Sequence, residues 1–343
     1  MQGTADILGH ERLIESLWDV AARSKQHHAY LFEGPEGIGK RRVALRFAMA
    51  LNCEARDSQP VEGTPCGQCQ TCAEIEQGIH ADVIWVEPEG KGVTRTIPVD
   101  RIREVIRVSG LHRYRARQRV IVIDPIDALN ESGANALLKT LEAPPEGTGF
   151  LLLTSKASAL LPTILSRCQR VRFGAVPYQR IADWLIAEHR VADATANRAA
   201  LLAQGCPGVA LTFTDEMLER RDEAKVALFD VLRGSAKDRF DYSESLTRGK
   251  RPDWMPRVEE RLAILEEILR DVALCATGSD APLLHPSDAE ETRRWVAMLW
   301  PGGLQRCADA IHETRKQLSA NVTGRTAVDA LLSVLHEETR PTG

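Results

Sequence analysis

A glycine-rich loop near the N-terminus constrains the fold of this chain more than any other feature. It reads GPEGIGKR over residues 34–41, between an apolar segment at 30–32 and a helical pattern that starts at Val43. The spacing G-x-x-x-x-G-K between a strand and a helix is typical of a phosphate-binding loop, whose backbone N–H groups face phosphate and whose lysine reaches the β- and γ-oxygens. The predicted nucleotide-binding residues of this loop are Gly34, Gly37, Gly39, Lys40 and Arg41.

The last residue of the loop, Arg41, departs from the pattern. Phosphate-binding loops carry Ser or Thr at this position, and the hydroxyl group coordinates Mg²⁺. A guanidinium group cannot ligate a metal ion. We therefore expect the architecture of an ATPase from which one metal ligand has been removed.

A second nucleotide element reads VIVIDPID over residues 120–127. An apolar strand that ends in Asp124 is typical of the acidic strand that holds Mg²⁺ through water. A buried strand whose last Asp caps a turn would give the same pattern, but the position downstream of the phosphate-binding loop favours the first interpretation. In hydrolysing proteins of this class a Glu follows and orients the attacking water, whereas Pro125 follows here.

Arg41 and Pro125 are two independent defects in the machinery of hydrolysis. Because the loss of one such group typically lowers the rate by orders of magnitude, we expect no intrinsic ATPase activity. Lys40 and the backbone cradle remain, so ATP or ADP can still bind without being hydrolysed.

Four clustered cysteines, Cys53, Cys66, Cys69 and Cys72, form two overlapping C-x-x-C steps and a more distant partner. This spacing predicts a closed Cys₄ site for structural Zn²⁺. Disulfides and idle thiols are the alternatives; a reducing cytoplasm disfavours the first and the spacing disfavours the second. The other cysteines are scattered and are interpreted as buried thiols: Cys168, Cys206, Cys275 and Cys307.

Apolar segments that alternate with helical patterns predict a parallel sheet covered on both faces. The expected strands are 30–32, 83–86, 119–124, 150–154 and 170–173. Beyond Pro177 only helical patterns remain. We expect an α/β nucleotide-binding domain over residues 1–173 with a zinc module at 53–72, a small helical lid over 174–214, and an all-α C-terminal oligomerisation domain over 215–343.

Composition excludes several classes of function. The formal net charge of −4, with charges well mixed along 343 residues, argues against autonomous DNA binding driven by electrostatics. No apolar run approaches the ~20 residues that a membrane span needs, and the N-terminus lacks the pattern of a secretory signal. We expect a cytoplasmic protein without membrane contact.

The segment NALLKTLEAPP at 135–145, followed by Ser166-Arg167-Cys168, resembles the signature of AAA+ sliding-clamp loaders. With the cysteine insert behind the phosphate-binding loop, the resemblance to bacterial clamp-loader subunits covers essentially the whole chain. Motor subunits of this family, of the gamma/tau type, keep an intact G-K-[ST] and a D-E pair. A second type has decayed nucleotide motifs but keeps S-R-C, and this sequence is similar to that type.

The resemblance implies a role for Arg167 as an arginine finger that enters the ATP site of an adjacent motor subunit, although an isolated Arg is more often a surface charge. A permanent guanidinium charge suits the transition state of phosphoryl transfer. The resemblance also places Thr154 where the family has a γ-phosphate sensor, although a Thr that ends a strand is a nearly equal interpretation. Val209 or a neighbour stands where motor subunits carry a phosphate-sensing Arg.

The partners implied by this family are gamma/tau-type motor subunits and a delta subunit of DNA polymerase III, with the sliding clamp and primer-template DNA reached through the complex. Two alternatives remain. The chain could be an active ATPase of the same family that recruits Asp127, or a zinc-containing nucleic-acid-binding protein with a vestigial nucleotide fold; the acidic balance disfavours the latter.

Overall fold

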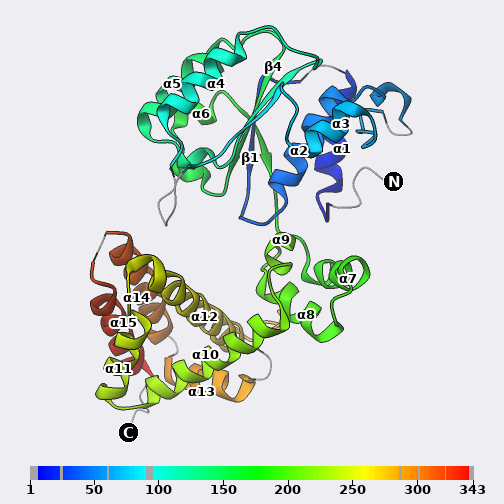
Figure 1. Ribbon diagram of the computed structural model, residues 1–343. Helices are drawn as coiled ribbons and strands as arrows, with labels where there is room; N and C mark the ends of the chain where they lie inside the picture. The colour runs from blue at the N-terminus through cyan, green and yellow to red at the C-terminus, as the bar shows by residue number, and fades with distance from the viewer. Residues whose placement is uncertain are drawn as a thin grey trace. The chain divides into compact units, whose positions relative to one another are not determined.

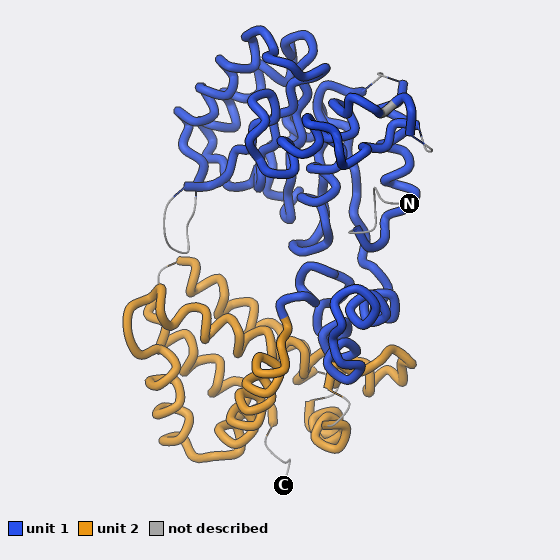
Figure 2. Tube along the Cα trace, turned by 45° about the vertical axis from the view of Figure 1, so that its right-hand side comes forward, with its two compact units in different colours: residues 1–212 blue, residues 213–343 orange. Residues whose placement is uncertain are grey.

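The computed structural model describes residues 7–23, 26–59, 62–89, 96–285, 288–299, 302–320 and 322–339. The chain divides into two compact units, residues 1–212 and 213–343, shown in blue and orange in Figure 2. The division falls after Thr212, so residues 174–212 cluster with the nucleotide-binding region. The prediction of a separate lid over 174–214 stays a prediction.

Unit 1 is built on a five-stranded parallel sheet with the order β2-β3-β4-β1-β5. The strands are β1 (Ala29–Glu33), β2 (Val83–Val86), β3 (Arg119–Ile123), β4 (Thr148–Thr154) and β5 (Gln169–Arg172). Every residue of β1, β3 and β4 is buried, as expected for strands covered on both faces. The predicted α/β class is confirmed. β5 lies at the edge beside β1, which explains its polar and mostly exposed residues.

Helices cover both faces of this sheet (Figure 1). The helices on one face are α4 (Val99–Ser109), α5 (Glu131–Glu142) and α6 (Pro162–Leu165), and those on the other are α1 (Glu11–Arg23), α2 (Lys40–Asn52) and α3 (Gln70–Glu76). The apolar residues of α4 and α5 pack with the strands into one buried core, centred on Ile121, Phe150 and Leu137. This core holds the strands in place, and with them the loops that leave from their two ends.

Three more helices complete unit 1: α7 (Tyr178–His189), α8 (Asp193–Leu202) and α9 (Pro207–Ala210). Short 3₁₀ helices lie at Arg56–Ser58, Ile126–Ala128 and Ala157–Ala159. The α9 segment contacts the phosphate-binding loop, because the Gly208 N–H donates to the Gly37 carbonyl oxygen at 2.8 Å. The helical residues after the sheet are thus tied to the predicted nucleotide site.

Unit 2 is helical throughout its described residues. Its helices are α10 (Asp215–Arg233), α11 (Ala236–Leu246), α12 (Arg251–Thr277), α13 (Ala289–Leu299), α14 (Gly302–Ser319) and α15 (Gly324–Glu338). The stripes predicted at 262–272 and 327–335 supply much of its core, including Leu262, Leu265 and Leu331. Among the helices that the structure describes, none has the length and apolar character needed to span a membrane.

Candidate functional site

The phosphate-binding loop lies at the carboxyl end of β1 and leads directly into α2. Gly37 and Gly39 adopt φ values of 73° and 106°, a region that strongly favours glycine. At Gly37 a Cβ atom would also lie 2.6 Å from a Val209 methyl group. The loop therefore needs glycine at both positions to turn into the helix, and at Gly37 also to accommodate the α9 segment.

Lys40 is buried, with 9% of its surface exposed, and points back into the loop. Its Nζ atom donates to the carbonyl oxygens of Gly34 at 2.7 Å and Pro35 at 2.8 Å. Burial lowers the pKa of its ammonium group from the ordinary value, an effect opposed by the nearby Asp124 and Glu36 carboxylates. The charge that this motif directs at phosphate is retained and lies at the base of the loop.

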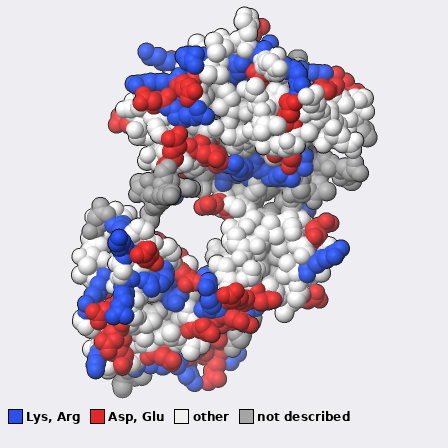
Figure 3. Space-filling model, viewed as in Figure 1, with Lys and Arg blue, Asp and Glu red and all other residues white. Residues whose placement is uncertain are grey.

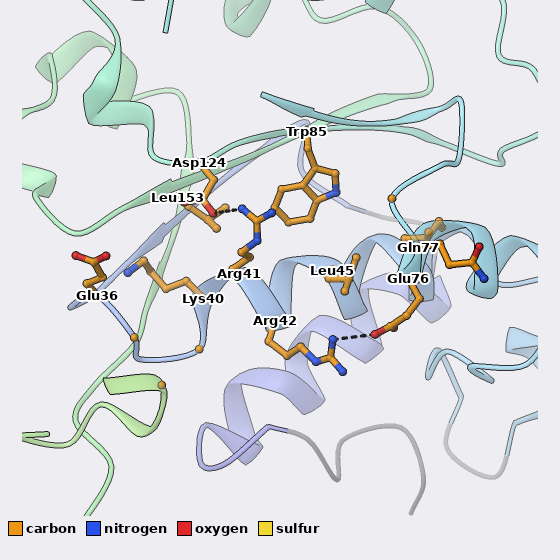
Figure 4. A pocket seen from close by; sticks show the side chains of 15 residues that line it. Glu36, Lys40, Arg41, Arg42, Leu45, Glu76, Gln77, Trp85, Asp124 and Leu153 are labelled. Atoms are coloured by element: carbon orange, nitrogen blue, oxygen red, sulfur yellow. Dashed lines mark hydrogen bonds and ion pairs between the residues drawn. The ribbon is translucent and has the colours of Figure 1, made fainter. Parts of the chain in front are cut away.

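Arg41 extends from the first turn of α2 to the carboxyl ends of two neighbouring strands (Figure 4). Its Nη1 atom donates to Asp124 Oδ2 at 3.0 Å and also to the carboxylate of Glu87, and the guanidinium carbon lies 4.4 Å from the centre of the Trp85 ring. Burial acts to lower the pKa of Arg41, but the hydrogen bonds that the guanidinium donates to both carboxylates outweigh it and raise that pKa. A fixed cation thus stands beside the acidic residue predicted to hold Mg²⁺.

Two cavities flank the phosphate-binding loop. One, of about 770 Å³, is lined by Lys40, Arg41 and Asp124 together with Trp85 and residues 75–78, which follow the cysteine module (Figure 4). The other, of about 540 Å³, is lined by Ile7, Leu8, Trp184 and Leu211. Gly37, Gly39, Arg42 and Gly208 border both. Charged side chains line the first cavity, whereas the second is mostly apolar, and both border the loop. This arrangement suits the phosphates and the base of a nucleotide.

Asp127 and Thr154 meet at the carboxyl ends of β3 and β4. Thr154 is fully buried, and its Oγ1 donates to Asp127 Oδ1 at 2.6 Å. The Thr154 hydroxyl also accepts a hydrogen bond from the Lys156 N–H at 2.9 Å. The structure therefore engages Thr154 in a strand-end turn and holds the Asp127 carboxylate at the same time.

The four predicted zinc ligands come together. The sulfur atoms of Cys53, Cys66, Cys69 and Cys72 all lie within 4.8 Å of one another, and those of Cys66 and Cys72 are 4.0 Å apart. A tetrahedral site with Zn–S bonds of about 2.3 Å needs sulfurs roughly 3.8 Å apart. The residues present therefore fit a structural zinc ion with no open coordination position.

Backbone N–H groups donate to the sulfurs of the cluster and favour thiolate at Cys66. The Gln68 and Cys69 N–H groups donate to Cys66 Sγ at 3.5 and 3.3 Å, and the Cys72 N–H donates to Cys69 Sγ at 3.4 Å. Partial burial acts to raise the pKa of Cys66, but the Gln68 and Cys69 N–H groups and the side chains of Cys53 and Cys69 outweigh it and lower that pKa to about 7. Burial raises the pKa of Cys53 and of Cys72. Thiolate is the form that binds metal.

Arg167 lies in the turn between α6 and β5, at the amino end of β5. The phosphate-binding loop lies at the other end of the strands, after β1. The Arg167 Nη2 atom donates to Glu142 Oε1 at 2.5 Å, and its Nη1 atom donates to the Thr163 carbonyl oxygen at 2.8 Å. About a third of its side chain is exposed. It borders a cavity of about 540 Å³ that is also lined by His27 and His28. Burial lowers the pKa of His28, which favours its neutral form beside the arginine.

Three partners of the predicted site residues were missed in the sequence. Glu87 and Trp85 contact Arg41, and Glu142 contacts Arg167. Glu87 follows β2 directly, and polar residues at the carboxyl ends of adjacent parallel strands lie close together. Its position in the sequence could therefore have predicted that it lies near Asp124. Glu142 lies inside the signature segment at 135–145, but nothing in the sequence pairs it with Arg167.

The other four cysteines do not join the cluster. Cys206 and Cys307 are buried and Cys168 and Cys275 are half-buried. Burial raises the pKa of the Cys168 and Cys307 thiols to about 12. Thiols with so high a pKa are not nucleophiles at neutral pH. The interpretation as buried thiols is confirmed for Cys206 and Cys307 and is wrong for Cys168 and Cys275, which are only partly buried.

Similarity to known proteins agrees with this geometry. The family described as "DNA polymerase III, delta subunit" matches residues 9–177. DNA polymerase III subunit delta' of Bacillus subtilis is 28% identical over 336 residues, which cover 95% of this chain and 96% of that protein. Subunit delta' of Pseudomonas aeruginosa is 38% identical over 155 residues, 45% of each chain.

A tau/gamma subunit is also similar. DNA polymerase III subunit tau/gamma of Haemophilus influenzae is 35% identical over 316 residues, which cover 90% of this chain and 40% of that protein. This chain therefore spans less than half the length of the tau/gamma relative, whereas it spans almost all of the Bacillus delta' subunit. The chain is therefore similar to a delta-prime subunit of DNA polymerase III over almost its whole length, and to a second one over 45% of it.

Proposed function

We propose that this chain is a non-hydrolysing subunit of a DNA polymerase III clamp loader in the bacterial cytoplasm. It would scaffold an assembly of gamma/tau-type motor subunits and a delta subunit that opens the sliding clamp and loads it on primed DNA. Its own phosphate-binding loop holds ATP or ADP without turning it over, and Arg167 completes the ATP site of a neighbouring motor subunit. Residues 174–214 would serve as its lid and residues 215–343 as its oligomerisation collar.

The position of Arg167 carries this proposal. β1 and β5 are parallel neighbours, with Tyr30 in register with Gln169. Arg167 precedes β5 and the phosphate-binding loop follows β1, so the two are separated by the length of a five-residue strand, roughly 16 Å at 3.3 Å per residue. This separation from its own phosphate-binding loop supports a trans-acting role for Arg167.

The proposed loss of hydrolysis rests on two positions: Arg41, which lines the larger cavity, and Pro125, which follows the lining residue Asp124. Arg41 replaces the hydroxyl that ligates the metal, and Pro125 replaces the carboxylate that orients water. Asp127, the residue that an active ATPase could recruit instead, accepts a hydrogen bond from Thr154. In a heterologous contact, different surfaces of successive subunits meet. Such a contact suits this subunit, because Arg167 and the phosphate-binding loop lie at opposite ends of the strands.

Autonomous nucleic-acid binding has less support. On the face shown in Figure 3, acidic and basic side chains are intermixed without a continuous basic stripe, and the whole chain carries a net charge of −4. Proteins that bind DNA on their own concentrate Lys and Arg on one surface. DNA contact is therefore assigned to the complex.

The structural zinc belongs to the same proposal. The four cysteine sulfurs would hold the ion and so join the end of α2 to α3. Residues 75–78, which follow Cys72 of α3, line the larger cavity. Zinc would supply no chemistry there, because all four coordination positions are taken by protein. It would fix one wall of the nucleotide site.

Co-purification and ATP turnover test the proposal together. The full-length chain should co-purify with the gamma/tau and delta subunits of its own organism and, alone, should hydrolyse no more ATP than its Lys40→Ala variant. The Lys40 variant controls for a contaminating ATPase. Turnover by the isolated wild-type chain that disappears in Lys40→Ala would show an active ATPase, and failure to assemble would remove the clamp-loader role.

A further inference from the structure

The residues around Asp124 do not fit the Mg²⁺ ion that this fold family implies. The hydroxyl ligand is absent, and the Asp124 carboxylate already accepts a hydrogen bond from Arg41 at 3.0 Å. A divalent cation at Asp124 would lie within a few ångströms of a permanent guanidinium charge and would be repelled by it. We propose that Arg41 replaces the magnesium ion, so that this site takes nucleotide phosphate without a divalent cation.

The position of Arg41 in α2 allows its guanidinium to reach the place where the metal ion would lie. It is the second residue of α2, the position from which phosphate-binding loops present the metal-ligating hydroxyl. Its long side chain carries the positive charge from that position to the end of β3, where the metal would lie beside Asp124 (Figure 4). One side chain therefore spans the distance that a hydroxyl, a metal ion and a water molecule span in a motor subunit.

Three groups from β2 and β3 hold the guanidinium there. Asp124 follows β3, Glu87 follows β2, and Trp85 in β2 presents its ring to the guanidinium. Register brings the two strands together, since Val86 pairs with Ile123. An arginine suits this position better than a lysine, because a planar guanidinium can bind two carboxylates and stack on an aromatic ring at once.

Arg42 supplies a matched control. It is the next residue of α2 and lines the same cavity, but its Nη1 atom is paired with Glu76 at 2.8 Å on the side away from Asp124. Replacement of Arg42 removes the same charge without clearing the place beside Asp124. Any effect found for Arg41 and not for Arg42 therefore concerns the metal position and not net charge.

The test compares wild type, Arg41→Thr and Arg42→Thr in thermal unfolding with ADP, with magnesium present or left out. Magnesium is left out and not chelated, because a chelator would also compete for zinc at the cysteine cluster. Ligand that binds the folded state raises the melting temperature. Wild type and Arg42→Thr should melt at the same temperature with and without magnesium. Arg41→Thr should gain an ADP-dependent shift with magnesium, equivalent to about a tenfold or greater increase in affinity.

Two results would overturn the proposal. One is a magnesium-dependent rise in melting temperature of the wild-type chain with ADP. The other is an Arg41→Thr variant that is folded by circular dichroism and gains no response to magnesium. If Arg41→Thr does not fold, electron paramagnetic resonance of wild type with Mn²⁺ and ADP decides the matter: the account predicts only free Mn²⁺–ADP, and a protein-bound manganese signal contradicts it.

Discussion

The Arg167 guanidinium is held by Glu142, with Nη2 2.5 Å from Oε1, at the edge of the sheet opposite to the phosphate-binding loop. The pair is partly exposed, so its own contribution to stability is small, within about 1 kcal/mol. Its effect is on conformation, because a free arginine side chain loses about 2 kcal/mol of rotamer entropy when it is fixed. In the proposed trans-acting role, Glu142 would reduce that loss by holding the guanidinium before a partner arrives.

Replacement of Glu142 by Gln should therefore weaken the arginine finger without removing it. We expect clamp- and DNA-stimulated ATP turnover of the reconstituted loader to fall a few-fold, with kcat lowered and the KM for ATP nearly unchanged, since the arginine acts in the transition state. Steady-state kinetics of loaders that contain wild-type or Glu142→Gln subunit measure this. A fall as large as that caused by loss of Arg167 itself would show that Glu142 does more than position it.

The cysteine cluster predicts one zinc ion per chain. Cys69→Ser should lower the zinc content measured by atomic absorption from about one ion per chain to near zero, because a structural site needs all four ligands, and it should lower the melting temperature as the metal no longer stabilises the insert. Cys275→Ser, a half-buried cysteine outside the cluster, is the control. Native protein without zinc would refute this prediction.

A buried ion pair predicts a pH dependence of stability. Asp82 and Arg119 are both almost fully buried, with Nη2 2.8 Å from Oδ1. Burial acts to raise the pKa of Asp82, but the backbone N–H groups of Arg115 and Ala116 and the Arg119 side chain outweigh it and lower that pKa. Because the folded-state pKa lies below that of the unfolded chain, about 3.9, the contribution of this pair is complete above that pH and is lost as the pH falls through the folded-state pKa.

Asp82→Asn should accordingly destabilise unit 1 by about 3–5 kcal/mol at neutral pH, because it leaves Arg119 buried without a counter-charge. Urea unfolding at neutral pH and below pH ~4 measures the effect, which should shrink at the acidic pH. Asp100→Asn, in an exposed pair with Arg103, is the control and should change stability by less than about 1 kcal/mol. Equal losses in the two variants would contradict the account.

The contact between the phosphate-binding loop and α9 predicts non-additive mutations. Gly37→Ala introduces a Cβ atom 2.6 Å from Val209 Cγ2 at a φ of +73°, and should lower stability by more than about 1 kcal/mol. Val209→Ala in the same chain removes the contact with the methyl group, but it leaves the 2.9 Å approach to the Val209 backbone nitrogen and the backbone strain, so the double variant should recover part of the loss. Thermal unfolding of the two single variants and the double variant measures this; strict additivity would exclude a direct contact.

Much of the fold could be predicted because its signals are local. β3 is a run of buried β-branched residues, and the loop at 34–41 has a fixed spacing, so both the parallel sheet and the place of the nucleotide site follow from the sequence. The cysteine cluster was equally accessible, because three of its ligands lie within seven residues.

The partners of the site residues were not accessible in the same way. Arg41 contacts Glu87, 46 residues away, and Arg167 contacts Glu142, 25 residues away. Such pairs depend on strand order and on rotamers that no local pattern specifies. The sequence showed that Arg41 cannot bind a metal, but only the structure shows its charge beside Asp124.

The central claim is that Arg167 acts on a neighbouring subunit, and ATP turnover of the reconstituted loader tests it most directly. Arg167→Ala should slow hydrolysis at the adjoining motor site by about 10³-fold or more, and so lower the clamp- and DNA-stimulated turnover of a loader that still assembles. Arg103→Ala, an exposed arginine on α4, should leave turnover unchanged. An assembled loader with Arg167→Ala that hydrolyses ATP at the wild-type rate would contradict the account.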